Sequence, residues 1–221
     1  MLQLPAAGNA QAAPVQPARP GVLAIWVASP DQLRPRLLAD LISRIAERHH
    51  LRASVSGPAP ADWMALNVHP ADVTAGPPEQ LDVAVGPVNS LGSPAYRIRP
   101  GRAGPVDITG VDPLALRLAL MQRPYRADVD LGPDDLRSSD EVLRGWRSLV
   151  QHWALSPSKP MCAQYTGDFL AALDDDLDTP AALRILSALA ADQVIPDGSK
   201  FEAFAHLDRF LGLDLAREVG R

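Results

Sequence analysis

Lysine is nearly missing from this chain, which has only Lys159 and Lys200 among its 21 basic residues. Phosphate-binding loops with an essential lysine and Schiff-base chemistry therefore have almost no candidate side chain. Cysteine is rarer still, because Cys162 stands alone. A single thiol excludes an internal disulfide and any metal site that is built from several thiolates of one chain.

Histidine offers no metal constellation either. The five histidines are His49, His50, His69, His152 and His206. None is spaced four residues from another, and the adjacent pair falls at the predicted end of a helix, where positive charge suits the helix dipole. A nucleophilic Cys162 would need a base, and only His152 is near it in sequence. We therefore expect no zinc.

Positive charge is also in short supply, since 26 acidic residues face 21 basic ones and the formal net charge is -5 over 221 residues. This balance argues against a protein that binds nucleic acid by bulk charge, so we do not expect tRNA as a partner. The longest apolar runs, such as residues 21–27, are far shorter than the ~20 residues of a membrane span. We expect a cytoplasmic protein with no membrane contact.

The first half of the chain predicts a small parallel sheet. Residues 1–20 are aperiodic in Ala, Pro, Gln and Gly, which predicts a disordered tail. Residues 22–28 are apolar without alternation, as in a strand buried on both faces, and a leucine stripe from Leu33 to Ile45 predicts a helix after it. Further strands are predicted at residues 52–55, 63–68 and 81–85, so that the chain begins as a βαβ unit.

A Pro- and Gly-rich linker at residues 93–112 separates this α/β domain, residues 21–92, from a helical domain at residues 113–221. Asp112 and Pro113 are typical of a helix start. The predicted helices of the second domain cover residues 113–123, 134–155, 165–173, 179–192 and 199–211. The predicted fold class is thus an α/β sheet followed by a helical bundle.

An acidic run at residues 174–178 precedes Thr179 and Pro180. Asp178 or Thr179 is the expected N-cap of the next helix. Asp174, Asp175 and Asp176 follow a helix, where negative charge opposes the dipole. The simplest interpretation is a solvated turn; cation binding and a salt bridge to Arg184 are the alternatives.

Three blocks of this sequence resemble the helical domain of cysteinyl-tRNA synthetases and of their relative, the cysteine ligase of mycothiol biosynthesis. They are residues 169–183, with the text D-D-D-L-D-T-P, residues 110–126, and residues 127–136. In that family a Rossmann-type domain adenylates cysteine with ATP. The resemblance therefore implies that residues 21–92 are a Rossmann-like remnant of that domain.

The family's catalytic motifs are degraded here. Asn89, Ser90, Leu91 and Gly92 resemble the end of its K-M-S-K-S-L-G-N motif, and its two lysine positions fall on Gly86 and Asn89. Residues 30–34 contain no histidine where H-x-G-H would stand.

The zinc-binding cysteine of the family is replaced by Ala28, and only about twenty residues separate Asn67 from Asn89, where the family has an inserted domain. Losing even one charge-stabilising donor typically costs about 10²–10³ in rate. The resemblance thus implies a non-catalytic, cysteinyl-tRNA synthetase-like binding or regulatory protein with an unknown protein partner.

We place a remnant nucleotide pocket, with weak ATP or AMP binding, at Asn89, Ser90, Leu91 and Gly92. Two alternatives stay open. One is an ATP-dependent ligase that uses Arg34 or Arg97 in place of the lysines, and the other is an accessory subunit of an active synthetase-like partner.

Overall fold

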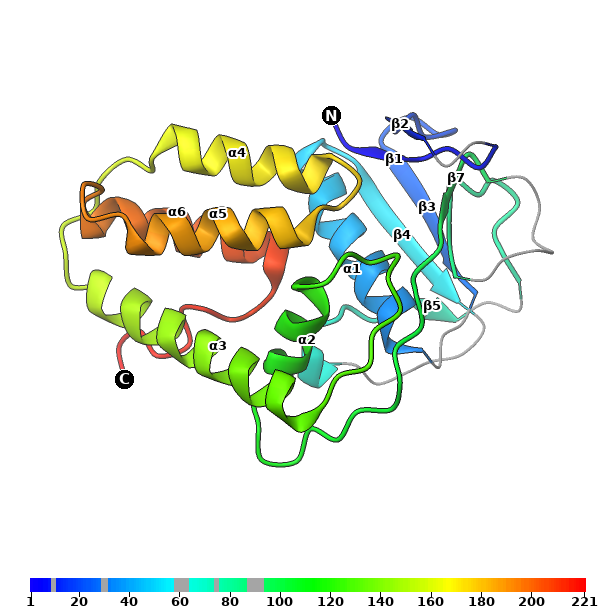
Figure 1. The fold of residues 1–221 in the computed structure, drawn as a ribbon. Coiled ribbons are helices and arrows are strands. Elements are labelled where there is room, and N and C mark those ends of the chain that lie inside the picture. The colour runs from blue at the N-terminus through cyan, green and yellow to red at the C-terminus, as the bar shows by residue number, and fades with distance from the viewer. Residues whose placement is uncertain (9–10, 29–31, 58–63, 74–75, 87–93) are drawn as a thin grey trace.

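A computed structural model describes residues 1–8, 11–28, 32–57, 64–73, 76–86 and 94–221. Its strands are β1 (Gln3–Pro5), β2 (Ala12–Pro14), β3 (Val22–Val27), β4 (Arg52–Gly57), β5 (Asp72–Val73), β6 (Val83–Val85) and β7 (Tyr96–Ile98). Its helices are α1 (Leu33–Arg48), the 3-10 turn η1 (Met64–Leu66), α2 (Pro113–Met121), α3 (Pro133–Trp153), α4 (Ala163–Asp174), α5 (Thr179–Ala191) and α6 (Asp197–Leu211). The sheet and the helices α2–α6 lie at opposite ends of the molecule, with α1 between them (Figure 1).

Five strands form one parallel sheet in the order β5-β4-β3-β6-β7. Counted along the chain within this sheet, the order is 3-2-1-4-5, which is that of the Rossmann-type dinucleotide-binding folds. The predicted Rossmann-like parallel sheet is therefore confirmed. The apolar run of β3 lies at its centre, and its residues 23–27 are buried, as is typical of a parallel sheet that is covered on both faces.

One predicted strand is wrong. Where residues 63–68 were expected to be extended, the described part is the turn η1, followed by Asn67 at a φ of 54°. A positive φ ends extended structure, and asparagine tolerates it better than most residues. The carbonyl of Asn67 accepts hydrogen bonds from Arg44 and Arg117, which hold the turn against α1 and α2.

The predicted disorder of residues 1–20 is also wrong for the described part of that segment. Strands β1 and β2 pair in an antiparallel hairpin, and Leu2 and Leu4 are almost completely buried. The Ala7 N–H donates to the carbonyl of Ala95 beside β7, and the Tyr96 hydroxyl donates to the carbonyl of Pro14. Few apolar residues suffice because the sheet, and not the hairpin alone, supplies the surface that buries them.

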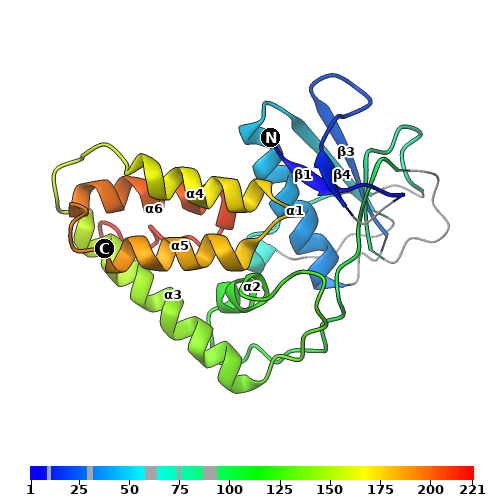
Figure 2. The ribbon, with the colours of Figure 1, turned by 45° about the horizontal axis from the view of Figure 1, so that its top comes forward.

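The predicted helices of the second half are confirmed. The Asp112 side chain accepts from the N–H of Leu114 at 2.8 Å and caps α2, with Pro113 at the first helical position. Helices α4 and α5 run side by side (Figure 2). Trp153 meets Phe204 of α6 edge to face, with ring centroids 5.1 Å apart, which closes the bundle core.

A buried ion pair joins the two halves. Asp40 of α1 and Arg117 of α2 are 3% and 1% exposed, and the Arg117 Nη2 lies 2.7 Å from the Asp40 carboxylate. Arg44 donates to the same carboxylate at 2.8 Å. Burial alone would raise the pKa of Asp40, but the guanidinium groups of Arg117 and Arg44 hold it below its usual range.

The remaining donors of Arg117 are used on backbone carbonyls. Its Nε donates to Leu211 at the end of α6, and its Nη1 donates to Leu66 in the turn η1 and to Asn67 directly after it. One guanidinium therefore bonds to α1, to η1 and to α6 from its place on α2. A fully buried arginine keeps its charge only where such partners surround it.

Replacing Arg117 by methionine leaves Asp40 buried with less countercharge. We expect Arg117→Met to lower the free energy of unfolding by about 3–5 kcal/mol, the usual cost of breaking a buried pair. Urea denaturation followed by circular dichroism measures it. The control is Arg137→Met, because Arg137 is exposed and pairs with the exposed Asp134 one helical turn away; it should change stability by less than about 0.5 kcal/mol. Equal midpoints for the two variants would contradict this role of Arg117.

Candidate functional site

In Rossmann-type sheets the ligand crevice lies outside the carboxyl ends of the two strands where the order reverses. Here these strands are β3 and β6, which end at Val27 and Val85. The Ala28 N–H donates to the carbonyl of Val85 at 3.0 Å, so the two strands stay together up to this edge. Ala28 brings only a methyl group, and Gly86 only backbone at a φ of 120°.

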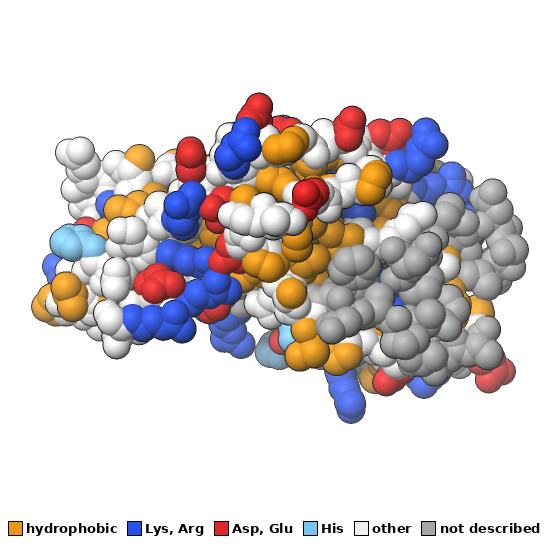
Figure 3. Space-filling model, turned by 90° about the horizontal axis from the view of Figure 1, so that it is seen from below, with side chains coloured by type: hydrophobic (Ala, Val, Ile, Leu, Met, Phe, Trp, Pro, Cys, Tyr) orange, Lys and Arg blue, Asp and Glu red, His pale blue; other side chains and the backbone are white. Residues whose placement is uncertain are grey.

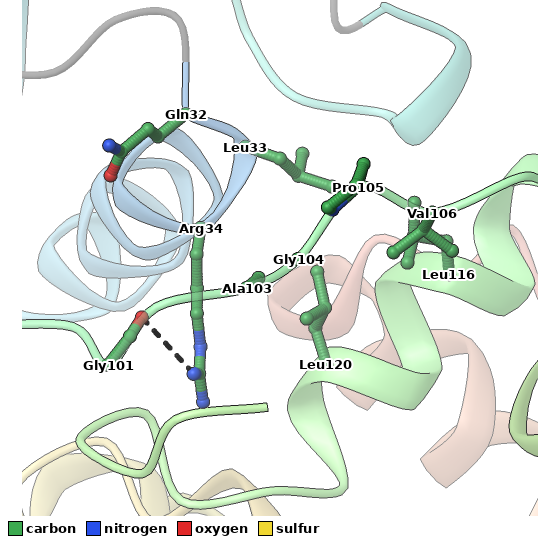
Figure 4. Close-up of a pocket in the computed structure, with 10 residues that line it drawn as sticks. All are labelled: Gln32, Leu33, Arg34, Gly101, Ala103, Gly104, Pro105, Val106, Leu116 and Leu120. Atoms are coloured by element: carbon green, nitrogen blue, oxygen red, sulfur yellow. Dashed lines mark hydrogen bonds between the residues drawn. The ribbon is translucent and has the colours of Figure 1, made fainter. Parts of the chain in front are cut away.

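A described cavity lies at the first turn of α1 (Figure 4). We name it the α1 hollow; it has a volume of about 270 Å³. It is lined by Gln32, Leu33, Arg34, Gly101, Ala103, Gly104, Pro105, Val106, Leu116 and Leu120. The lining therefore comes from α1, from the connection after β7, and from α2. It is mostly apolar and holds one ionic side chain.

That side chain, Arg34, holds α1 against two other segments of the chain, and we call it the Arg34 clamp. It is 3% exposed, and its Nη1 donates to the carbonyls of Gly101 (3.3 Å) and Ala127, while its Nη2 donates to Pro124 at 2.7 Å. Burial lowers its pKa, against the opposing pull of Asp128. Both terminal nitrogens are thus used on backbone, which speaks against Arg34 as a replacement for a catalytic lysine.

Gly101 makes this clamp sterically feasible. A Cβ at this position would lie 2.1 Å from the carbonyl oxygen of Ala127, so the connection and the α2–α3 loop could not approach as they do. The Gly101 N–H donates to the carbonyl of Tyr125, and the Val129 N–H donates to that of Arg102. Backbone hydrogen bonds thus join the connection after β7 to the α2–α3 loop beside the hollow.

The predicted pocket residues Asn89, Ser90, Leu91 and Gly92 lie outside the described residues, as do residues 29–31. The amino-acid composition of these and the other segments outside the described residues still limits which charged groups they could bring to the crevice. Residues 29–31, 58–63, 74–75 and 87–93 contain no lysine, arginine or histidine. None of these segments can bring a cationic side chain to the crevice.

The acidic run is not a plain solvated turn. Asp174 is 8% exposed and accepts hydrogen bonds from Arg48 and from His49, the latter at 2.6 Å. Burial alone would raise the pKa of Asp174, but these bonds from His49 and Arg48 lower it below its usual value. Only Asp175 fits the expectation, since its side chain is exposed.

The rest of the run is also structural. Asp176 accepts from the Tyr125 hydroxyl at 2.7 Å and pairs with Arg126, and Asp178 caps α5 through the N–H of Ala181. The Thr179 hydroxyl donates to the carbonyl of Met121 instead of capping the helix. The alternative of a salt bridge from these aspartates to Arg184 is not found.

The two longest blocks that resemble the synthetases therefore contact each other. Tyr125 and Arg126 end one block, and Asp176 belongs to the other. Asp112 of the first block pairs with Arg147 of α3 at 2.7 Å. The matching residues hold the helical half together and present no reactive group to the α1 hollow.

Within the described ranges, no group of three or more His, Cys, Asp and Glu residues is arranged to hold a metal ion. None of the described helices is both long and apolar enough to cross a membrane. On the face that Figure 3 shows, basic and acidic side chains are interspersed over the helical half, and hydrophobic side chains gather near the middle.

Comparison with known sequences supports one group of enzymes. An L-cysteine:1D-myo-inositol 2-amino-2-deoxy-alpha-D-glucopyranoside ligase from Streptomyces griseus is 40% identical over 90 residues, which is 41% of this chain and 21% of the ligase. The ligases of the same name from Salinispora arenicola and Gordonia bronchialis are 36% and 37% identical over 109 and 111 residues, each 48% of this chain and 26% of the ligase. The chain is a partial relative of these cysteine ligases.

No family model matches the chain. The aligned segments span about a fifth to a quarter of each ligase. The predicted resemblance is thereby confirmed over part of the chain, as a relationship to synthetase-like ligases.

The contrast between Asp174 and Asp175 gives a test. The lowered pKa of Asp174 means that its stabilisation is complete above its unfolded pKa of about 3.9 and is lost as the pH falls through the folded value. We expect Asp174→Asn to cost about 1–3 kcal/mol at pH 7 and progressively less below about pH 4. Asp175→Asn should cost less than about 0.5 kcal/mol at both. The midpoints of urea denaturation at pH 7 and pH 3 measure these losses of stability. An equal loss in both variants would refute the pairing of Asp174.

Proposed function

We propose that this chain is a binding protein on a cysteine-ligase framework, without adenylation or aminoacylation activity. One observation carries this: the arginine at the start of α1, Arg34, has both terminal nitrogens on backbone carbonyls. A synthetase-like enzyme needs cationic side chains at the crevice to bind the phosphates of ATP. The first turn of α1 supplies no free cationic group for this purpose, because Arg34 is engaged with the backbone.

The two lysines of the chain do not fill this gap. Lys200 is buried in α6 and donates to the carbonyl of Ala190, and Lys159 lies between α3 and α4. Charge that develops on the α-phosphate and pyrophosphate would find no ammonium group from the sheet half of the chain, where the sequence has no lysine. Each missing donor costs about 10²–10³ in rate, so several together leave little catalysis.

The α1 hollow can still accept an uncharged group. Leu33, Val106, Leu116 and Leu120 give it apolar walls, and its volume of about 270 Å³ is near the lower end of small-molecule sites. The Gln32 side chain does not cap α1, which leaves N–H groups of the first turn to a ligand. We therefore propose weak binding of AMP or ATP, in which the β- and γ-phosphates add nothing.

The names of the similar ligases state cysteine as a substrate. We do not transfer cysteine to this chain, because Ala28 cannot ligate a thiolate-binding zinc ion. We propose a protein partner as the physiological target, with the nucleotide as a minor ligand.

Pyrophosphate exchange tests the absence of adenylation. With ATP and each of the twenty amino acids, we expect no exchange above the rate without protein, while the Streptomyces griseus ligase run beside it with cysteine gives a clear signal. Exchange with any one amino acid would establish the ligase alternative and overturn our proposal.

Calorimetry tests the nucleotide. We expect AMP and ATP with Mg²⁺ to bind equally, with Kd values of about 1 mM or weaker. Ala103→Trp should abolish the binding of adenosine, which carries no phosphate, because Ala103 is exposed at the wall of the hollow, and it should leave stability within about 0.5 kcal/mol. Micromolar ATP binding that is much tighter than AMP binding would show that other cations serve the phosphates.

A further inference from the structure

A second hollow, away from α1, is lined by three arginines. It has a volume of about 550 Å³ and lies between Pro5–Gly8 of the N-terminal hairpin segment, Arg97 and Arg99 of the β7 segment, and Arg126 after α2. Among the described residues that line it there is no carboxylate. Three guanidinium groups on one cavity stand out in a chain whose net charge is -5.

Sheet geometry explains why two of these arginines face the same way. Side chains alternate along a strand, so Arg97 and Arg99 lie on the face opposite to Tyr96 and Ile98, which belong to the hydrophobic core. The backbone of the hairpin runs beside them, since the Ala7 N–H donates to the carbonyl of Ala95. The hairpin thus forms one wall of the cavity.

The three arginines differ in their partners. Arg126 pairs with Asp176 and lies 4.9 Å from the centre of the Tyr125 ring, so its charge is already compensated. Arg97 and Arg99 have no acidic partner among the described residues. The Nε of Arg97 is also buried without a hydrogen-bond acceptor, which is unfavourable for a charged donor.

We propose that this arginine hollow binds the phosphate group of a phosphate monoester. Two uncompensated guanidinium groups match the charge of about -1.5 to -2 that such a group carries at pH 7. Planar guanidinium groups bind phosphate oxygens through pairs of parallel hydrogen bonds, which also fixes the group's orientation. This site is separate from the α1 hollow and independent of the function proposed above.

The position of the arginines favours one compact anion over a long polyanion. The cationic groups converge on a cavity and do not follow a stripe, as a nucleic-acid backbone would need. Asp176 beside Arg126 would also repel a chain of phosphates passing that side. A single phosphate held by Arg97 and Arg99, with Arg126 at the rim, avoids that repulsion.

Calorimetric titration with inorganic phosphate and with glycerol 3-phosphate, at constant ionic strength set by sodium chloride, tests the site. We expect one binding site for each ligand, and an affinity at least about tenfold lower in Arg97→Gln and in Arg99→Gln. Arg137→Gln is the matched control, because Arg137 is an exposed arginine of α3 that pairs with Asp134; its affinity should stay within about twofold of the wild-type value. Tighter binding of the ester than of inorganic phosphate would identify an esterified ligand, and equal binding a free phosphate.

The charge match is tested by pH. A phosphate monoester has its second pKa near 6, so the affinity for glycerol 3-phosphate should fall several-fold between pH 7.5 and pH 5.5, whereas that for sulfate, a dianion throughout, should not change. Circular dichroism confirms that each variant is folded. No binding at about 10 mM phosphate, equal weakening by Arg137→Gln, or an oligonucleotide that binds far more tightly than phosphate and displaces it would overturn the proposal.

Discussion

The buried pair of Asp40 and Arg117 is the constraint on which the arrangement of the molecule depends. A carboxylate and a guanidinium that are both almost inaccessible to water can be tolerated only in one geometry, with every strong partner in place. That geometry fixes α2 against α1, and α1 in turn covers the sheet. The turn η1 and the end of α6 are bound to the same guanidinium, so the orientation of the helical half relative to the sheet follows from one side chain.

Arginine side chains connect segments of the backbone to one another. Arg34, Arg44, Arg117 and Arg147 all donate to main-chain carbonyls of segments far away in sequence. Five donors in a rigid plane suit this purpose better than a single ammonium group. The abundance of arginine thus reflects internal bracing in large part, whereas Arg97 and Arg99 line a cavity together with Arg126.

The sequence was sufficient for features that depend on local patterns. The apolar run of β3, the leucine stripe of α1 and the Asp112–Pro113 start of α2 follow from periodicity and capping, which act within a few residues. The hairpin at residues 3–14 could not be predicted, because its leucines are buried by segments distant in sequence. The partners of Asp174 were missed for the same reason, since His49 lies 125 residues away. The local sequence of the acidic run contains no information about these distant partners.

The connection at residues 99–106 looks like a domain linker in the sequence, yet it is pinned by Arg34 and stitched to the α2–α3 loop. A chain cut there would yield a sheet fragment with the carboxylate of Asp40 facing no guanidinium from α2, and a helical fragment with Arg117 facing no carboxylate. Each fragment would therefore lack the oppositely charged partner that stabilises its buried charge. A buried ion pair thus crosses the boundary between the two kinds of secondary structure, and dissection of the protein into halves would remove it.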